Sequence, residues 1–527
     1  MLLPLVLEKS LRYRFIHAFL LTTPLVLTAA VFSDVGADHG LDDLILRIGI
    51  ENIPTGLNVQ VGQVEADTAN GDYGPDINDP DIAGKTFIFH SGSTGISNHA
   101  TNVGKRMYGF GNSGIAPDVN FIDVYSAEGW ATSDYLRVGT GSNPSSPPGN
   151  LELFNNSWIA SFGSNSIDSQ GLRRADWSID THNVMMLNGV ANAGKHLPLM
   201  SFGFNCVSVG LSDGSHVSGV VQGGFDQSGM QIPLIVATQG SSSNATGVVS
   251  AITALLVETR ETHPNTKNNF FATFTETMKA VLLTGGNHQA GWTNNPIASG
   301  VNRGRTNQPI DAVFGVGIAN IDRSHRVLTG GQHVSSSTPS GLTVAPNAGW
   351  DTAAISNNQS KFIRFNVVSL ADEVSILLTW HQKVNTGFGS YSIADLDLEL
   401  MHYNNGKPTS LVGDAGLNVF ESGNIVSESE IDNVEHLYIQ NLSPGDYVLE
   451  VHRLDSAVGS RVFGVGWLFP EQNGVPGDLD GNGLVDVNDL LVIIGAWGPC
   501  SGDCPADLSG DGIVSVSDIL LLLSFWS

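Results

Sequence analysis

Three serines stand together at positions 241–243, directly before an apolar run that continues to Leu256. The run suits a buried helix, and a segment of small residues, 244–247, opens it. A hydroxyl at the start of a buried helix is well placed for nucleophilic chemistry, because the helix N-terminus favours negative charge and small neighbours let a substrate approach. Serines at a helix N-terminus are more often caps than nucleophiles, so other residues must decide between the two roles.

A second pattern, near the C-terminus, places oxygen-bearing side chains at loop positions 1, 3, 5, 9 and 12, with glycine at position 6. A hard cation such as Ca²⁺ takes six or more oxygen ligands, and the glycine permits the sharp turn of the loop. The pattern occurs twice, and each loop leads into an apolar run, 490–497 or 519–526, that predicts a helix. The expected ligands are Asp478, Asp480, Asn482, Asp486 and Asp489 with the carbonyl of Leu484 in the first loop, and Asp507, Ser509, Asp511, Ser515 and Asp518 with the carbonyl of Ile513 in the second.

This paired layout resembles the type I dockerin, because position 12 is Asp rather than Glu and no full helix precedes either loop. The resemblance implies a small α-helical domain over 471–527, with two Ca²⁺ sites and a cohesin-like protein as its partner. The second loop should bind Ca²⁺ more weakly, since two of its ligands are serines. Cys500 and Cys504 are close enough to pair in an oxidising compartment, and Cys206 is expected to be a buried small hydrophobe.

Length and composition limit the class of protein. The 527 residues exceed one domain, and a hydrophobic content of 41% excludes global disorder. Acidic residues outnumber Lys and Arg by 51 to 24, so the formal net charge is −27. This charge argues against nucleic acid and anionic membrane surfaces as partners, and it fits an extracellular Ca²⁺-binding protein.

Residues 1–37 read as an export signal. A basic start is followed by a mostly apolar run from Phe15 to Phe32, and small residues at 28–30 and 36–37 offer two cleavage positions. The alternative is a membrane anchor, since the run approaches the length of a membrane span. We expect a secreted protein whose leader is removed and that then has no stable membrane anchor.

Short motifs along residues 38–330 follow the order of the subtilisin-like serine proteases. Strand 55–65 resembles the first core strand of that family, and the family's triad aspartate falls on Glu65. The segment 98–104 (NHATNVG) is similar to the family's histidine motif and places His99. The segment 184–194 (VMMLNGVANAG) matches the strand before the oxyanion asparagine, and Ala245-Thr246 aligns the serine segment on Ser243. The resemblance implies an α/β domain with a parallel sheet and flanking helices.

The resemblance to the subtilisin-like proteases also implies roles for four residues. Ser243 would be the nucleophile, His99 the general base, Glu65 the acid that orients His99, and Asn192 the oxyanion donor. The chain departs from the family where the acid is Glu and where Ser241-Ser242 replaces Gly-Thr before the serine. Asp67 remains the alternative acid and Ser242 the alternative nucleophile. Glutamate is one methylene longer than aspartate, so it serves only if the strand end retreats or the side chain folds back.

After a polar linker over 331–348, short alternating strands without long helices predict an antiparallel β-sandwich over 349–470. The segments 395–400, 432–435 and 444–447 resemble the jelly-roll module that follows many secreted subtilisin-like proteases. Their carboxylates could hold Ca²⁺, although solvated strand edges are the commoner reason for such residues.

The function expected from these patterns is a secreted serine-type endopeptidase acting on a protein or peptide, with a Ca²⁺-binding docking module. The rival expectation is a catalytically degenerate scaffold that serves as a Ca²⁺-dependent attachment protein. A carbohydrate-active enzyme is suggested only by the usual company of dockerin-like modules, and no carboxylate pair in the sequence supports it.

Overall fold

The computed structural model describes residues 34–455, 459–469, 477, 479, 485–500, 504–509 and 511–526. Most of the predicted leader lies outside these residues, and so do Asp478, Asp480, Asn482 and Leu484 of the first predicted Ca²⁺ loop. Among the helices in the described ranges, none is long and apolar enough to cross a membrane.

A seven-stranded sheet lies at the centre of the first large region, in the order β2-β3-β1-β4-β5-β6-β9. Every neighbouring pair in it is parallel, which confirms the predicted parallel sheet with flanking helices. Its strands are β1 (Gln60–Glu65), β2 (Thr86–Phe89), β3 (Phe121–Ser126), β4 (Leu151–Asn156), β5 (Met185–Gly189), β6 (Val207–Leu211) and β9 (Ile235–Ala237).

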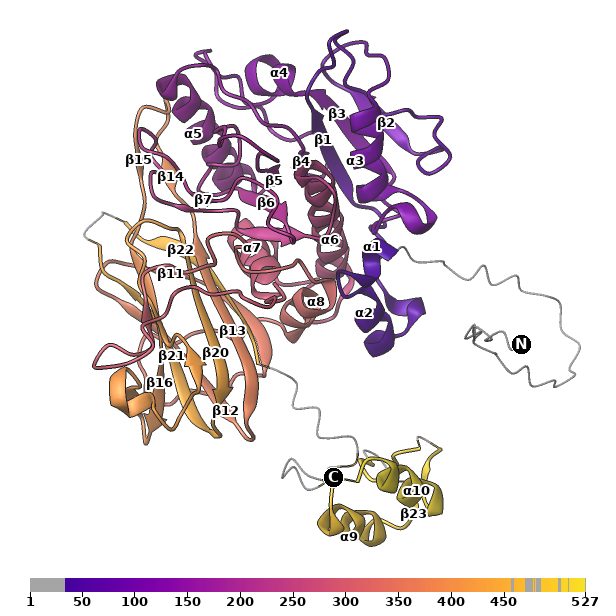
Figure 1. Cartoon of the computed structure of the whole chain (residues 1–527), viewed down its shortest axis with the longest axis vertical. Coiled ribbons are helices and arrows are strands. Elements are labelled where there is room, and N and C mark those ends of the chain that lie inside the picture. Colours follow the sequence, from indigo (N-terminus) through magenta and orange to yellow (C-terminus); the bar gives the residue numbers. More distant parts are fainter. Residues whose placement is uncertain are drawn as a thin grey trace, which may run out of the picture. The chain divides into compact units, whose positions relative to one another are not determined.

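Helices cover both faces of this sheet (Figure 1). Since side chains alternate along a strand, Val61 of β1 faces the apolar core shared with α3 (Asn98–Tyr108) and α6 (Ser242–Thr262), whereas Val64 faces the core shared with α5 (Asn165–His182). In a parallel sheet the carboxyl ends of all strands meet at one edge, so the residues after β1, β4 and β5 come together there.

The lead-in before β1 is part of this region. It contains α1 (Asp34–Ala37), α2 (Leu41–Ile48) and the 3₁₀ turn η1 (Ile50–Asn52). Leu41 and Leu44 are buried in the core, and the buried His39 accepts a hydrogen bond at Nε2 from the Thr238 N–H, at 3.1 Å. Residues 34–54 therefore pack as an integral layer of the α/β region.

The remaining elements of the α/β region are short helices, turns and strands at its rim. They are α4 (Ala127–Gly129), α7 (Thr275–Thr284), α8 (Ile321–Gly330), η2 (Gly111–Ser113), the π-turn η3 (Trp130–Asp134), η4 (Phe270–Thr273), β7 (Gly219–Val220), β8 (Gln231–Ile232) and β10 (Arg305–Thr306).

The next region is a β-sandwich, because two sheets, antiparallel except for the parallel pair β10 and β19, share one apolar core. One sheet has the order β10-β19-β16-β21-β12 with β17 paired to β16, and the other β11-β22-β13-β20-β18. The elements are β11 (Ala348–Ile355), β12 (Ser360–Val367), β13 (Ala371–Trp380), β14 (Lys383–Val384), β15 (Tyr391–Ser392), β16 (Leu396–Asn404), β17 (Lys407–Ser410), η5 (Gly413–Gly416), β18 (Ser422–Gly423), β19 (Val426–Ser427), β20 (Val434–Leu442), β21 (Gly445–Arg453) and β22 (Arg461–Leu468).

The sandwich packs directly on the α/β region. A Cβ at Gly464 of β22 would lie 2.2 Å from the Glu276 carbonyl oxygen of α7, so glycine is required for this close approach. The predicted linker, 331–348, forms bridges with β11 and β12, for example between Ser336 and Phe362, and thus lies along the sandwich. Strand β10, from the α/β part of the chain, completes one sandwich sheet by pairing with β19.

The C-terminal region contains α9 (Val487–Gly495), α10 (Val516–Ser524) and the paired strands β23 (Gly498–Pro499) and β24 (Ile513–Val514). A disulfide joins Cys500 and Cys504, as expected, and Cys206 is buried. Both helices begin three residues before the predicted positions 490 and 519. The reason is a capping box at each start, in which Asp486 and Ser515 are the N-caps.

Candidate active site

Glu65 and His99 form a hydrogen-bonded pair at the carboxyl edge of the parallel sheet. Glu65 is the last residue of β1 and is fully buried, and His99 lies in the first turn of α3 and is half exposed. The distance from His99 Nδ1 to Glu65 Oε2 is 2.7 Å. This hydrogen bond raises the pKa of His99 above its ordinary value, against the opposing effect of burial.

The other carboxylate considered for this role, Asp67, does not contact His99. It is exposed, and its Oδ2 accepts a hydrogen bond from Ser126 Oγ at 3.1 Å. The glutamate is therefore long enough to reach the imidazole from the strand end, and the Nδ1–H of His99 is taken by Glu65. The second ring nitrogen, Nε2, has no hydrogen-bond partner among the described residues and can serve as a base.

Ser243 is the second residue of α6 and is partly exposed. Its Oγ donates to the carbonyl oxygen of Ser157 at 3.2 Å, and the Ser157 hydroxyl in turn donates to the Ser243 carbonyl at 3.0 Å. Within the described residues, Ser243 Oγ makes no hydrogen bond to His99. A rotation of the Ser243 side chain would have to bring its hydroxyl to the imidazole when substrate enters, since catalytic hydrogen bonds often form fully only in the complex.

Ser242 differs from Ser243 in burial and in its hydroxyl partner. It is 2% exposed, and its Oγ donates to the Val190 carbonyl at 2.6 Å. Its hydroxyl thus satisfies a backbone acceptor at the end of β5. Ser241 is the N-cap of α6, with its Oγ accepting from the Asn244 N–H. Two of the three serines therefore hold the helix start in place, and Ser243 is the one whose hydroxyl is accessible.

Asn192 lies on the exposed loop after β5. Its Oδ1 accepts a hydrogen bond from the Ser242 N–H at 2.7 Å, so its Nδ2 is the group left to donate. The Ser243 N–H, in the first turn of α6, has no acceptor among the described residues, as is usual at a helix start. An amide side chain and a backbone N–H are thus both available beside the Ser243 hydroxyl.

One cavity brings these groups together. It has a volume of about 350 Å³, and His99, Asn192, Ser243 and Asp67 all line it. The fully buried Glu65 lies behind His99 and does not line the cavity. Ser157, whose carbonyl and hydroxyl both bind Ser243, was not among the predicted site residues, although the segment 153–158 resembles a strand beside the substrate channel of the subtilisin-like proteases.

A neighbouring hollow of about 470 Å³ shares Ala66, Asp67, Trp158 and Ile159 with this cavity. Its other walls include the apolar side chains of Ala131, Phe162 and Leu199. The cavity lined by His99, Asn192 and Ser243 therefore continues into a hollow with several apolar walls, which suits an extended ligand with an apolar side chain.

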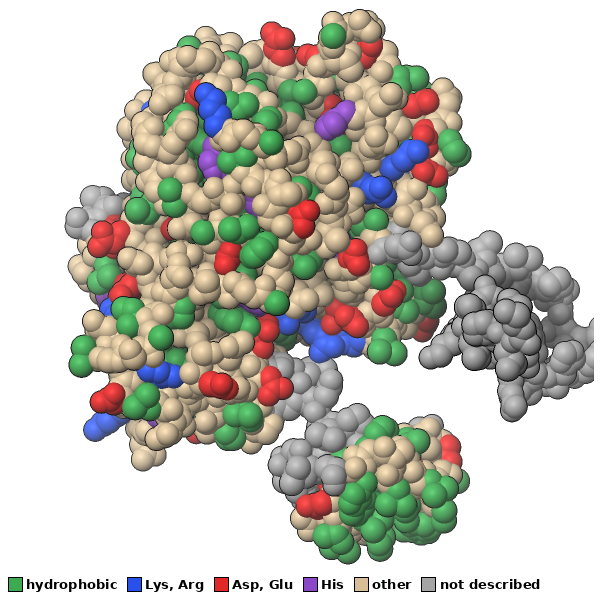
Figure 2. All heavy atoms as spheres, in the orientation of Figure 1, with side chains coloured by type: hydrophobic (Ala, Val, Ile, Leu, Met, Phe, Trp, Pro, Cys, Tyr) green, Lys and Arg blue, Asp and Glu red, His purple; other side chains and the backbone are tan. Residues whose placement is uncertain are grey.

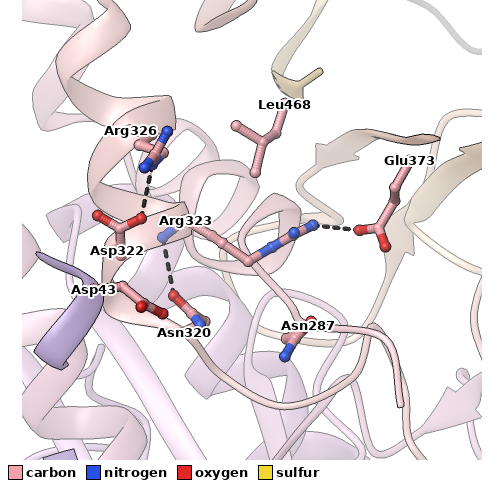
Figure 3. A pocket seen from close by; sticks show the side chains of 8 residues that line it. All are labelled: Asp43, Asn287, Asn320, Asp322, Arg323, Arg326, Glu373 and Leu468. Atoms are coloured by element: carbon pink, nitrogen blue, oxygen red, sulfur yellow. Dashed lines mark hydrogen bonds and ion pairs between the residues drawn. The ribbon is translucent and has the colours of Figure 1, made fainter. Parts of the chain in front are cut away.

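A further hollow of about 310 Å³ lies between α8 and the sandwich strand β13. Figure 3 shows two ion pairs among the side chains that line it. Arg323 Nη2 lies 2.6 Å from Glu373 Oε1, and Arg326 Nε lies 2.7 Å from Asp322 Oδ2. The Arg323–Glu373 pair joins α8 to β13, whereas the Arg326–Asp322 pair lies within α8. Because each arginine already has a carboxylate partner, we assign no ligand to this hollow.

Among the residues that the structure describes, two groups have the residue types for a metal ion. Asp180, Glu276 and His381 meet between α5, α7 and the sandwich, but Lys383 already supplies a cation to Asp180. The second predicted Ca²⁺ loop offers only oxygen donors, which fits the chemistry of Ca²⁺. Asp507 Oδ2 accepts the Gly512 N–H at 2.8 Å, which folds the loop around this carboxylate. The last predicted ligand of each loop, Asp489 or Asp518, is fully buried.

No family model and no curated protein matches the chain. Solved serine proteases align with parts of it. The Prenylagaramide maturation protease PagA aligns at 16% identity over 54% of this chain and 98% of its own, with a TM-score of 0.34. The serine protease of Aeromonas sobria, solved with a chaperone, aligns at 14% identity over 78% and 87%, with a TM-score of 0.34. The psychrophilic subtilisin-like protease Apa1 from Pseudoalteromonas sp. AS-11 aligns at 11% identity over 54% and 96%, with a TM-score of 0.33. Because these TM-scores are low, we describe the fold of this chain from its own strand order and helices alone.

Proposed function

We propose that this chain is a serine-type endopeptidase in which Ser243, His99, Glu65 and Asn192 carry out peptide hydrolysis. The observation that carries the proposal is the His99–Glu65 hydrogen bond of 2.7 Å, placed beside the accessible hydroxyl of Ser243 in one cavity. A buried carboxylate, an imidazole and a serine at a helix start are the parts that acyl transfer to water requires.

In the proposed reaction, Ser243 Oγ attacks the carbonyl carbon of the substrate while His99 Nε2 takes its proton. Glu65 holds the Nδ1–H, which fixes the tautomer with a free Nε2 and stabilises the imidazolium that forms. His99 then gives the proton to the leaving amine as the peptide C–N bond breaks. In the second half, a water molecule attacks the acyl carbon while His99 Nε2 takes a water proton. The ester bond to Ser243 then breaks, the carboxylic acid leaves, and His99 returns the proton to Ser243 Oγ.

The negative charge that develops on the substrate oxygen needs donors that are already in place. Asn192 Nδ2 and the Ser243 N–H would provide them, because the Asn192 amide is held by the Ser242 N–H. The start of α6 adds the favourable end of a 21-residue helix dipole.

A fluorophosphonate label tests the proposal directly. The Ser243 oxygen would displace fluoride from phosphorus while His99 accepts the proton, so a stable adduct reports a working nucleophile and base. We expect the folded protein to be labelled, Ser243→Ala to lose the label, and the neighbouring Ser242→Ala to keep it. Equal labelling of the wild type and of Ser243→Ala would refute the assignment of Ser243 as the nucleophile.

The rival function, a degenerate scaffold used for attachment, has one observation in its favour. The Ser243 hydroxyl is hydrogen-bonded to the Ser157 carbonyl at 3.2 Å rather than to His99. If that bond persists when substrate is present, Ser243 is not activated. A protein that stays unlabelled but binds its partner in a Ca²⁺-dependent way would establish this function instead.

We further propose that the C-terminal region binds Ca²⁺ in its two loops and docks onto a cohesin-like protein. Equivalent apolar side chains are exposed on both helices, at Val487, Leu491 and Ile494 of α9 and at Val516, Leu520 and Leu523 of α10. Figure 2 shows apolar side chains gathered over this region. A stripe at this spacing is typical of a helix face that packs against a partner.

Calorimetry with CaCl₂ measures the first part of this proposal. We expect two binding events, and Asp518→Ala should abolish one of them. An unchanged titration in the variant would contradict the Ca²⁺ assignment. The leader would place the protein in the oxidising, Ca²⁺-rich extracellular space, which suits the Cys500–Cys504 disulfide.

A further inference from the structure

A buried chain of hydrogen bonds continues from Glu65 away from His99. Gln63 precedes Glu65 by two residues on β1, so both side chains point to the same face of the sheet, toward α3. Gln63 Nε2 donates to Glu65 Oε1 at 2.9 Å and to the Ala100 carbonyl at 2.8 Å. The Tyr108 hydroxyl, from the last residue of α3, donates to Gln63 Oε1 at 2.5 Å.

The orientation of the Gln63 amide is fixed by these neighbours. Its nitrogen faces two acceptors, the Glu65 carboxylate and the Ala100 carbonyl, and its oxygen faces a hydroxyl. A flipped amide would set an oxygen against two acceptors, so only one orientation satisfies all three contacts. Burial raises the pKa of Tyr108 well above its ordinary value, so its hydroxyl remains a donor.

The sequence makes room for this arrangement at Gly104. A Cβ at that position would lie 2.4 Å from the Tyr108 hydroxyl oxygen and 2.8 Å from the ring carbon that bears it. Glycine one turn before Tyr108 thus allows the tyrosine to lie back over its own helix and reach Gln63. Gln63, Glu65 and Tyr108 are all fully buried, so water cannot replace a hydrogen-bond partner that a substitution removes.

We propose that Gln63 and Tyr108 are positioning residues, which aim the Glu65 carboxylate at His99 and so let a glutamate serve as the orienting acid. A glutamate has one more rotatable bond than an aspartate, and an unheld carboxylate could turn away from Nδ1. The donation from Gln63 Nε2 to Oε1 leaves Oε2 directed at the imidazole. Gln63 also links β1 to both ends of α3, and thereby sets the strand that carries Glu65 against the helix that carries His99. This inference rests on the proposed function for its catalytic consequence only.

Three substitutions test the proposal. Gln63→Met keeps the shape but removes the donor, Tyr108→Phe removes the hydroxyl, and Gly104→Ala displaces the tyrosine. We expect Gln63→Met to slow fluorophosphonate labelling on the order of tenfold, and the other two to slow it less, because their effect reaches Glu65 only through Gln63. In a Glu65→Asp background, Gln63→Met should change the labelling rate little further, because the shorter Asp carboxylate no longer reaches Gln63 Nε2.

The His99 pKa provides a readout independent of labelling. In protein with ¹³C-labelled histidine, the His99 signal can be identified by its absence in His99→Ala. We expect its pKa to fall toward the ordinary value in Gln63→Met, since a misaimed carboxylate no longer stabilises the imidazolium. A lower melting temperature with an unchanged His99 pKa and labelling rate would overturn the proposal. If the wild type is not labelled, the proposed function fails, while the His99 pKa still tests the positioning.

Discussion

The two halves of the candidate active site are held in different ways. Glu65 is fully buried, its carboxylate has a partner on each oxygen, and Gln63 and Tyr108 extend the network into the core. Ser243 is partly exposed, and a single 3.2 Å hydrogen bond to the Ser157 carbonyl restrains its hydroxyl. Under the proposed function, the fold would preorganise the half that handles the proton, whereas the nucleophile half would be completed only when substrate enters the cavity.

The largest effect should come from breaking the preorganised half. Glu65→Gln keeps the shape but removes the charge that stabilises the imidazolium, and changes of this kind cost about 10⁴-fold in turnover in a serine protease triad. The rate of hydrolysis of fluorescein-labelled casein measures this loss of turnover. The matched variant Asp67→Asn should lose far less activity than Glu65→Gln, since Asp67 lines the cavity but contacts Ser126 and not His99. A larger loss in Asp67→Asn than in Glu65→Gln would reverse the assignment of the acid.

Asn192→Leu should cause the next largest loss, about 10²–10³-fold in turnover, by removing one oxyanion donor. The same substitution also removes the acceptor for the Ser242 N–H, which is a structural hydrogen bond of 2.7 Å. Asn192→Asp separates the two roles, because it keeps that acceptor but offers no donor. Full activity in Asn192→Asp would show that the Asn192 side chain serves only as the acceptor for the Ser242 N–H.

The smallest effect is expected at Ser157. Its hydroxyl carries one proton, which is shared between two acceptors, Asn155 Oδ1 at 2.8 Å and the Ser243 carbonyl at 3.0 Å. Ser157→Ala therefore loosens the start of α6 and keeps the carbonyl that accepts from Ser243. We expect a loss of stability of about 1 kcal/mol and a modest change in labelling rate. Thermal unfolding and labelling kinetics measure both. A hundredfold loss of labelling would mean that the nucleophile half is as tightly preorganised as the acid half.

The sequence predicted those features of the molecule that depend on short stretches of neighbouring residues. The α/β region, the pairing of Cys500 with Cys504 and the helices behind the predicted Ca²⁺ loops could all be read from residue patterns. The Ala245-Thr246 register favoured Ser243 over Ser242. The physical difference between the two hydroxyls could not be read from the sequence, because it depends on the Val190 carbonyl, which accepts a hydrogen bond from Ser242 Oγ. The role of Gln63 was equally hidden, since its partner Tyr108 is 45 residues away in the chain.

The boundary between the α/β region and the sandwich shows the same limit. The polar, turn-rich stretch 331–348 has the composition of a linker, yet it forms bridges along β11 and β12. What fixes it is tertiary packing, such as the close contact of Gly464 with α7, and composition does not report such contacts. The predicted residues of the first Ca²⁺ loop before Val485 lie outside the described part of the chain.

The pH dependence of fluorophosphonate labelling tests the central claim most directly, because it reads the nucleophile and its base together. His99 must be neutral to accept the proton, and its hydrogen bond to Glu65 raises its pKa above 6.5. Labelling should therefore rise with pH through a midpoint above 6.5, and in Glu65→Gln this midpoint should move down. The same raised pKa means that the pair stabilises the fold fully below pH 6.5 and loses this contribution as pH rises through the midpoint. Labelling that is absent, or whose midpoint is the same in Glu65→Gln, would contradict the pairing of Glu65, His99 and Ser243 as one catalytic unit.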